Sequence, residues 1–179
     1  MMMRENNIRI GISQCLTNSI VRYDAAKKYN KDLISYLSKY FELVPICPEV
    51  ECGLSVPRPA VELINSDNGI SIIGRDDKHL DVTDKLINYS KNKVKELSGL
   101  SGYVFKSRSP SCGVGSTPVF NLNGEIQYYA NGVFVTSLLG LYPNLPVVEG
   151  GYLEGDVVRN EFIQKVMGYS GLERSDSVG

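Results

Sequence analysis

Residues 8–16 read IRIGISQCL, a short run in which isoleucines alternate with other residues before the chain reaches a cysteine. Alternation of β-branched residues with a period of two is typical of a strand, so we expect the first strand here. The polar pair Ser13-Gln14 ends the run. Cys15 is therefore expected directly after the carboxyl end of that strand.

Two further strands are expected to lead to a cysteine in the same way. Residues 41–46 form an apolar run that stops before Cys47, because the proline that follows cannot donate a hydrogen bond to a sheet. Residues 102–106 form a third run, and the loop after it carries Cys112. Ligands of parallel sheets bind at the carboxyl ends of the strands. We therefore expect folding to bring these cysteines to one edge of a sheet.

The segments between these strands carry weaker signals. Apolar residues recur at helical spacing over residues 33–41, 81–97, 132–141 and 157–167. Asp81 or Thr83 is expected to cap the second of these helices. We further expect a short helix over residues 60–64, a hairpin arm over 70–73 and a fourth strand over 145–148. Residues 49–59 and 116–129 are expected to be irregular, with a turn at Asn123-Gly124.

Strands that alternate with helices predict the α/β class: a single three-layer, Rossmann-like domain with a mainly parallel sheet and right-handed crossovers. The 179 residues have the length of one domain. We expect the domain over residues 1–169 and a polar, disordered tail over residues 170–179. A domain of this size can fold without a metal or a disulfide, so a bound metal would serve chemistry rather than folding.

Composition limits the classes of function. The formal net charge of −1 argues against broad nucleic-acid binding, which needs a concentrated basic surface. No apolar run approaches the ~20 residues of a membrane-spanning helix, and the polar N-terminus lacks the features of a signal peptide. We therefore expect a cytoplasmic protein, in which thiols stay reduced and cysteines serve as ligands, nucleophiles or core residues.

The cysteines leave several possibilities open. Thiolates are ligands for zinc and for iron–sulfur clusters. Zinc sites often contain Cys-x-x-Cys pairs, but this sequence has none, and its one histidine, His79, is far in sequence from any cysteine. Three thiolates would leave one metal position open, as catalysis requires. The alternatives are a zinc site that includes Cys52 and, for each cysteine, a place in the apolar core.

Five short motifs follow one another along the chain: Ile-Ser-x-Cys-Leu at 12–16, Val-Arg-Tyr-Asp at 21–24, Val-Pro-x-Cys-Pro-Glu-Val at 44–50, Gly-Leu-x-x-Pro-Arg at 53–58 and Lys-x-Arg-Ser-Pro-Ser-Cys-Gly at 106–113. In this order they resemble the bacterial 2-thiouracil desulfurase (TudS-like) family, over roughly residues 8–150. The Cys-Pro-Glu-Val and Ser-Pro-Ser-Cys-Gly motifs are specific in combination, whereas either alone is weak.

The resemblance implies a [4Fe-4S] cluster held by Cys15, Cys47 and Cys112, with one iron left open. It implies an enzyme that desulfurates a 2-thiouracil-like nucleobase without net redox change and releases sulfide. The substrate would be a small thioamide or thiolated pyrimidine. Because the family commonly has a small residue at the position of Cys52, that thiol is expected to be a bystander.

Three further residues are candidates for the chemistry that the resemblance implies. Water must attack the ring carbon, and Glu49, two residues past Cys47, is the expected general base. Ser109 and Ser111 flank the third ligand and are expected to relay protons or hold the intermediate. These three could instead be a solvated carboxylate and turn-forming serines. The alternative function is a non-catalytic protein that binds an iron–sulfur cluster or zinc and senses iron or oxygen.

Overall fold

The central sheet of the protein is parallel. In a computed structural model that describes residues 7–17, 31–55 and 59–176, its strand order is β2-β1-β5-β8. The strands are β1 (Arg9–Ser13), β2 (Glu42–Ile46), β5 (Leu100–Phe105) and β8 (Val147–Glu149), and every neighbouring pair is parallel. The expected mainly parallel sheet is confirmed.

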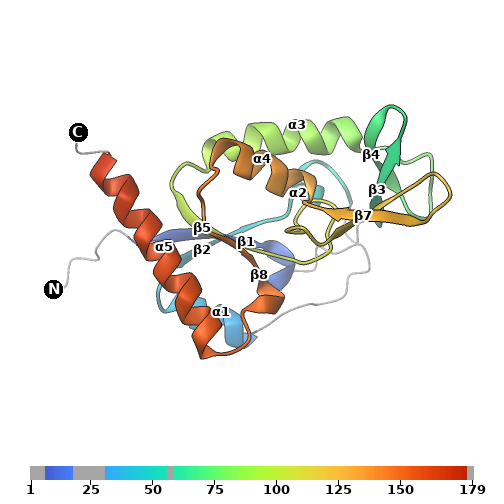
Figure 1. Cartoon of the computed structure of the whole chain (residues 1–179). Coiled ribbons are helices and arrows are strands. Elements are labelled where there is room, and N and C mark those ends of the chain that lie inside the picture. Colours follow the sequence, from blue (N-terminus) through green and yellow to red (C-terminus); the bar gives the residue numbers. More distant parts are fainter. Residues whose placement is uncertain (1–6, 18–30, 56–58, 177–179) are drawn as a thin grey trace.

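Helices cover both faces of this sheet, which gives the three expected layers (Figure 1). On one face lie α1 (Lys31–Ser38) and α5 (Asp156–Asp176), and on the other lie α3 (Thr83–Lys93) and α4 (Val133–Leu141). Leu37 and Val166 pack with Ile10 in the first core cluster, and Phe134 packs with Tyr103 in the second. Among the described helices, none has both the length and the apolar character needed to cross a bilayer.

The close approach of β1 and β5 depends on a glycine. A Cβ at Gly11 would fall on the ring of Tyr103, which is fully buried and stacks on Phe105 with ring centroids 3.9 Å apart. All six residues of β5 are buried, as expected of a central strand with helices on both faces. This packing fixes the strand ends from which the site is built.

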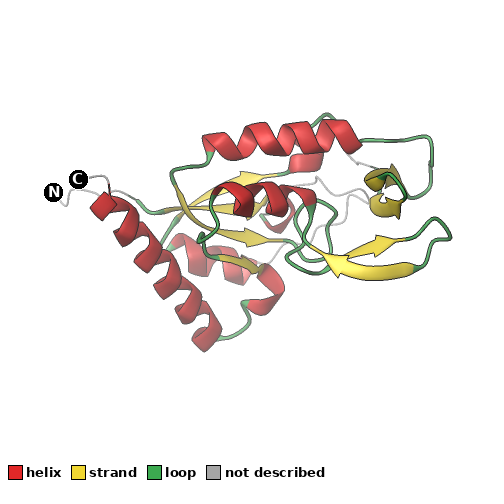
Figure 2. Cartoon of the chain, turned by 45° about the horizontal axis from the view of Figure 1, so that its top comes forward, coloured by secondary structure: helices red, strands yellow, loops and turns green. Residues whose placement is uncertain are grey.

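A second, mixed sheet lies beyond the carboxyl ends of the first, at the end of the molecule away from the start of β1 and the end of α5 (Figure 2). Its order is β4-β3-β6-β7, with β3 (Val61–Ser66), β4 (Gly69–Gly74), β6 (Thr117–Phe120) and β7 (Ile126–Ala130). The helix expected over residues 60–64 is wrong, since Val61 and Leu63 are buried in a strand. The irregular segment expected over residues 116–129 is also wrong, because it forms the β6–β7 hairpin.

Four shorter helical segments complete the fold: α2 (Pro48–Glu51) and the 3₁₀ helices η1 (Gln14–Leu16), η2 (Val94–Glu96) and η3 (Gly150–Tyr152). The loop expected from residue 49 therefore begins with a helical turn, because Pro48 occupies the first helical position. The helix α5 continues to Asp176, past Ser170, where the disordered tail was expected to begin. The motif residues Arg22, Asp24, Pro57 and Arg58 lie outside the described residues.

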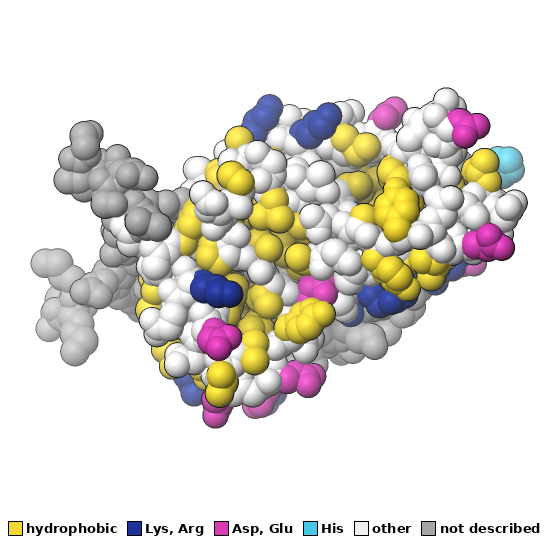
Figure 3. All heavy atoms as spheres, in the orientation of Figure 1, with side chains coloured by type: hydrophobic (Ala, Val, Ile, Leu, Met, Phe, Trp, Pro, Cys, Tyr) yellow, Lys and Arg dark blue, Asp and Glu magenta, His cyan; other side chains and the backbone are white. Residues whose placement is uncertain are grey.

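Charged side chains are interspersed on the face seen in Figure 3, where lysines and arginines alternate with acidic residues and apolar patches. This face carries no concentrated basic surface. The distribution agrees with the near balance of charge in the sequence, where 19 basic and 20 acidic residues nearly cancel.

Candidate active site

A pocket of about 320 Å³ lies between the two sheets. One wall comes from the segments that follow β1, β2 and β5, and the other comes from β3 and β6. The chain passes from β1 to β2 and later returns to β5 on the other side of β1. This is the topological switch point of the sheet, where α/β proteins bind their ligands.

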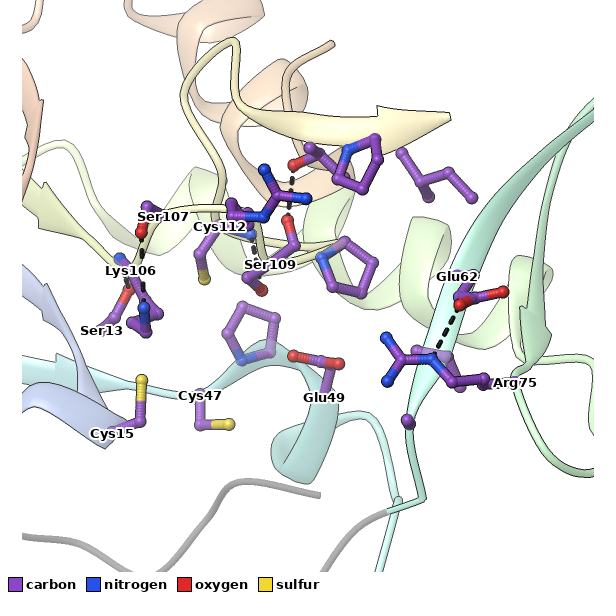
Figure 4. A pocket seen from close by; sticks show the side chains of 18 of the residues that line it. Ser13, Cys15, Cys47, Glu49, Glu62, Arg75, Lys106, Ser107, Ser109 and Cys112 are labelled. Atoms are coloured by element: carbon purple, nitrogen blue, oxygen red, sulfur yellow. Dashed lines mark hydrogen bonds and ion pairs between the residues drawn. The ribbon is translucent and has the colours of Figure 1, made fainter. Parts of the chain in front are cut away.

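Cys15, Cys47 and Cys112 all line this pocket, and all three are buried and outside any disulfide. Figure 4 shows them around one end of the pocket, Cys15 and Cys47 directly after strands and Cys112 in the loop that follows β5. Cys15 lies in η1 directly after β1, and Cys47 precedes α2 directly after β2. The convergence expected of the three cysteines is thus present in the fold.

The position of Cys47 is fixed by a helix cap. Cys47 has an extended backbone before the first turn of α2, and its N–H donates a hydrogen bond of 2.9 Å to the Glu51 carboxylate. Glu51 in turn lies 3.7 Å from the Lys93 ammonium group of α3. A side chain in the first helical turn that reaches back to the capping residue stabilises the start of a helix. The ligand candidate is therefore tied to a packed helix.

The surroundings of the Cys112 thiol change its pKa strongly. That pKa is raised to about 12: burial raises it most and the charges of Glu49 and Cys15 also raise it, while hydrogen bonds with Ser111 and Ser13 lower it. Those electrostatic effects place Glu49 and Cys15 near this thiol. A metal that bound here would have to displace the thiol proton, since the thiolate is the ligand.

Cys52 differs from the other three cysteines. It does not line the pocket, and its Sγ donates to the Glu49 carbonyl oxygen at 3.2 Å. Among the residues that the structure describes, no three His, Cys, Asp or Glu side chains are grouped closely enough to hold a single metal ion. Soft thiolates are the protein ligands of iron–sulfur clusters. The donor set of three buried thiols fits a cluster.

Glu49 lines the pocket and is only 4% exposed. Its carboxylate accepts a hydrogen bond of 3.1 Å from the Ser111 hydroxyl, which is fully buried and does not line the pocket. Ser109 does line the pocket, and its Oγ lies 3.1 Å from that of Ser111. The predicted catalytic residues therefore form one contiguous network.

The direction of this network follows from the hydrogen-bond donors. The Oγ of Ser109 accepts the N–H groups of Ser111 at 3.3 Å and Cys112 at 3.2 Å. Since a hydroxyl oxygen has two acceptor positions, the Ser109 proton is left to donate to Ser111. Ser111 donates to Glu49, so a directed chain of hydroxyls runs from the pocket surface to the buried carboxylate.

The end of the pocket away from the cysteines carries a charged pair. There Arg75 pairs with Glu62 at 2.7 Å, whereas Lys106 lies beside Ser13 on the cysteine side (Figure 4). Phe120 also lines the pocket. Sequence reasoning missed this pair, because Glu62 lies in β3, which was expected to be a helix, and Arg75 follows β4 in a turn that no motif marks. It also missed Ser13, although the Ile-Ser-x-Cys-Leu motif contains it; the Ser13 Oγ accepts the Lys106 N–H at 3.0 Å.

Comparisons with known proteins agree with this geometry. A family model described as 2-thiouracil desulfurase matches residues 10–150. A solved structure described as the [4Fe-4S]-dependent thiouracil desulfidase TudS has a TM-score of 0.63 and 25% sequence identity, over 82% of this chain and 93% of that one. No curated protein matches the sequence of this chain. The matched residues include all three pocket cysteines.

Proposed function

Since the chain belongs to the 2-thiouracil desulfurase family, [4Fe-4S]-dependent desulfuration of thiouracil is its activity, and we propose that Cys15, Cys47 and Cys112 hold the cluster. The observation that carries this proposal is the lining of one pocket by three buried thiols from three strand ends. Soft thiolates are the ligands of iron–sulfur clusters. The non-catalytic alternative is not favoured, because the family and the similar structure are both described as desulfurating.

Three thiolates leave one iron without a protein ligand. When bound, the cluster supplies this iron as a Lewis acid for the soft thiocarbonyl sulfur. Thiouracil and water give uracil and hydrogen sulfide, so both protons of the water must reach the leaving sulfur. This reaction involves no net oxidation or reduction. Besides binding the cluster, the protein therefore needs to supply only a group that accepts and returns protons.

Glu49 supplies that group in our proposal. Its carboxylate is buried at the pocket wall and accepts the hydrogen bond from Ser111. It takes a proton from the attacking water and returns it to the leaving sulfur, as general acid–base catalysis requires. Ser109 is the hydroxyl at the pocket surface, and Ser111 connects it to Glu49. Ser109 is therefore the serine that faces the substrate, and Ser111 is the relay.

The rest of the pocket accepts a flat ring. Leu63, Pro118 and Phe120 provide apolar lining on the wall opposite the cysteines. Small-molecule sites combine apolar walls with polar groups that orient the ligand, and Glu62 and Arg75 line the same pocket. The proposed substrate is a small thiolated pyrimidine, and the proposed location is the cytoplasm, where the thiols stay reduced for cluster binding.

The test is an anaerobic preparation reconstituted with iron and sulfide. We expect about four irons per chain, a brown protein and release of sulfide on incubation with 2-thiouracil. Uracil should appear in step with sulfide, since the reaction consumes only water. Iron binding without sulfide release would contradict the desulfurase activity, and absence of iron from the reconstituted protein would contradict the ligand set.

A further inference from the structure

Glu149 is a buried carboxylate next to the site that the proposed reaction does not use. It ends β8, where it pairs in register with Phe105, the last residue of β5. Its exposure is 4%, and it does not line the pocket. A carboxylate is almost never buried without hydrogen-bonding partners, so its contacts indicate its role.

Glu149 accepts hydrogen bonds from the loop that carries Cys112. The carboxylate Oε2 accepts the Val114 N–H at 3.2 Å and the Ser116 hydroxyl in a short hydrogen bond. The Oγ of Ser116 in turn accepts the Arg108 N–H at 2.8 Å. One carboxylate oxygen thus connects both ends of the segment that contains Ser109 and Cys112: the Val114 end directly and the Arg108 end through Ser116.

The backbone at Arg108 adopts an uncommon conformation that must be stabilised by contacts around it. Arg108 has a φ of 62°, and it is the one non-glycine residue in the left-handed region among the residues that the structure describes. Side chains rarely adopt this conformation, which persists where the surroundings enforce it. Its N–H is fixed by Ser116, whose hydroxyl is in turn committed to Glu149. The loop therefore leaves β5 in a conformation that depends on the carboxylate.

Hydrogen bonds between uncharged groups then connect the ends of this loop to Ser109. The carbonyl oxygen of Ser109 accepts the Thr117 hydroxyl at 2.6 Å and the Gly113 N–H at 3.0 Å. These bonds make the loop a closed unit, so a shift of its flanks moves Ser109 and Cys112 together. Glu149 ties this unit to β8, which pairs with β5 in the central sheet.

We propose that Glu149 is a positioning residue that, through Ser116 and the Val114 amide, holds the Ser109–Cys112 segment in its active geometry. The inference rests on the proposed roles of Cys112 as a ligand and of Ser109 as the hydroxyl that faces the substrate. Outer partners that orient metal ligands typically contribute ~10–100-fold to metal affinity or activity. We expect Glu149 to act within this range.

The first arm of the test uses the full chain without a cluster. Amide hydrogen exchange of Val114 and Arg108 is measured by NMR in the wild type, Glu149→Gln, Ser116→Ala and the control Glu125→Gln, whose carboxylate is exposed. Loss of the charge-assisted bond in Glu149→Gln should accelerate exchange of both amides roughly tenfold or more. Ser116→Ala should accelerate exchange of Arg108 and leave Val114 protected.

The second arm uses the reconstituted protein. Glu149→Gln should alter the visible circular dichroism of the cluster and lower kcat ~10–100-fold, with much less change in KM. Ser116→Ala should alter the same spectrum to a smaller degree, and Glu125→Gln should leave both unchanged. A merely structural role would lower the amount of folded protein without changing the spectrum or kcat per cluster.

Amide exchange and a cluster spectrum that match the control in both Glu149→Gln and Ser116→Ala would overturn the positioning role. A wild type that releases no sulfide would instead overturn the proposed function. In that event the exchange arm would still decide whether Glu149 holds the loop, because it needs neither cluster nor substrate.

Discussion

Cys52 and Cys112 illustrate how two free thiols of one chain differ in their surroundings. Cys112 is buried at the pocket. Cys52 is half-buried directly after α2, and its thiol donates a hydrogen bond to a backbone carbonyl oxygen of that helix. We predict that Cys112→Ala loses the cluster, because the remaining two thiols cannot hold it. Cys52→Ala should bind the full amount of iron. Iron content and visible absorbance after reconstitution measure both, and loss of iron in Cys52→Ala would show that the proposed set is incomplete.

Glu49 carries the sharpest prediction about chemistry. Glu49→Gln keeps the shape of the side chain but removes its ability to take a proton, so we expect turnover to fall ~10²–10⁴-fold with the cluster retained. Sulfide release per cluster is the measurement. The exposed Glu154→Gln serves as the control and should keep full activity. Near-normal turnover in Glu49→Gln would move the general base to another group.

Sequence motifs suggest candidate residues of the site, but not how these residues contact one another. Glu49, Ser109 and Ser111 belong to specific motifs, and the structure joins them in one network. That Ser109 faces the pocket while Ser111 is buried behind it depends on the path of the loop, which no local pattern encodes. Glu149 directly follows a predicted strand, so its place at a carboxyl strand end was an available signal that sequence reasoning did not use.

At the scale of elements, the start of α4 holds the loop that carries Cys112. The N–H groups of Gly132, Val133 and Phe134 donate to loop carbonyl oxygens at 2.8–3.0 Å. The first N–H groups of a helix have no partner within the helix, so the loop satisfies them. Gly132 is required at this contact, because a Cβ there would fall on the backbone of Ser111.

We therefore predict that Gly132→Ala destabilises the protein by about 1–3 kcal/mol and lowers cluster loading, because the loop must shift to accommodate the added methyl group. Its φ of −61° suits alanine, so the effect comes from lack of space alone. Gly140→Ala in the same helix is the matched control, since a Cβ there meets nothing within 4 Å. Urea unfolding and iron content measure the two effects, and equal behaviour of both variants would contradict the packing argument.

The entry to α3 gives a pH-dependent prediction. Hydrogen bonds from the Thr83 hydroxyl and N–H hold the pKa of Asp81 below its ordinary value. A carboxylate with a lowered pKa in the folded state stabilises that state at neutral pH, and this contribution is lost as the pH falls through the folded pKa. Asp81→Ala should cost about 0.5–1 kcal/mol at pH 7, a small effect because the group is exposed.

The measurement for Asp81 is thermal unfolding of the wild type and the variant from pH 7 down into the acid range where aspartates protonate. The difference in Tm should be largest at pH 7 and should shrink as Asp81 becomes protonated. Asp76→Ala, exposed in the preceding loop, provides the control. A difference that stayed constant with pH would show that the hydrogen bonds do not depend on the charge.

The elements were predictable where a local sequence pattern marks them. The strands β1, β2 and β5 carry continuous apolar or β-branched runs, and α3 and α4 carry apolar residues at helical spacing. By contrast, residues 126–129 of β7 are all exposed, so no alternation marks this strand. The pairing of β3 with β6 joins Leu63 to Val119 across more than fifty residues of chain, a relation that a local pattern cannot show.

At the scale of the whole molecule, one wall of the pocket could be predicted from local sequence patterns, whereas the other depends on long-range pairing. Its cysteine wall follows from one general rule, that parallel strands present their carboxyl ends at one edge. Its other wall, with Glu62, Arg75 and Phe120, comes from the second sheet and depends on how that sheet packs against the first. The side of the site proposed to bind the ring therefore required the fold, while the side proposed to bind the cluster did not.

The last prediction concerns the relation between cluster and folding. Buried apolar clusters pack on both faces of the central sheet and under the second sheet, and most of their members lie away from the three pocket thiols. A chain of this length with such cores should remain folded when the cluster is removed, unlike small domains that are unfolded without their metal. Far-UV circular dichroism of the cluster-free chain should match that of the loaded protein.

The cluster should nevertheless raise the thermal midpoint, because it binds the folded state and not the unfolded chain. A linkage contribution of about 4 kcal/mol corresponds to an increase in Tm of roughly 8–16 °C for a domain of this size. Cys112→Ala, which cannot hold the cluster, should melt near the cluster-free wild type, and loaded Cys52→Ala near the loaded wild type. Loss of helical signal on cluster removal would instead mean that the three thiols and their cluster hold the two sheets together, and that the apolar cores alone do not specify the fold.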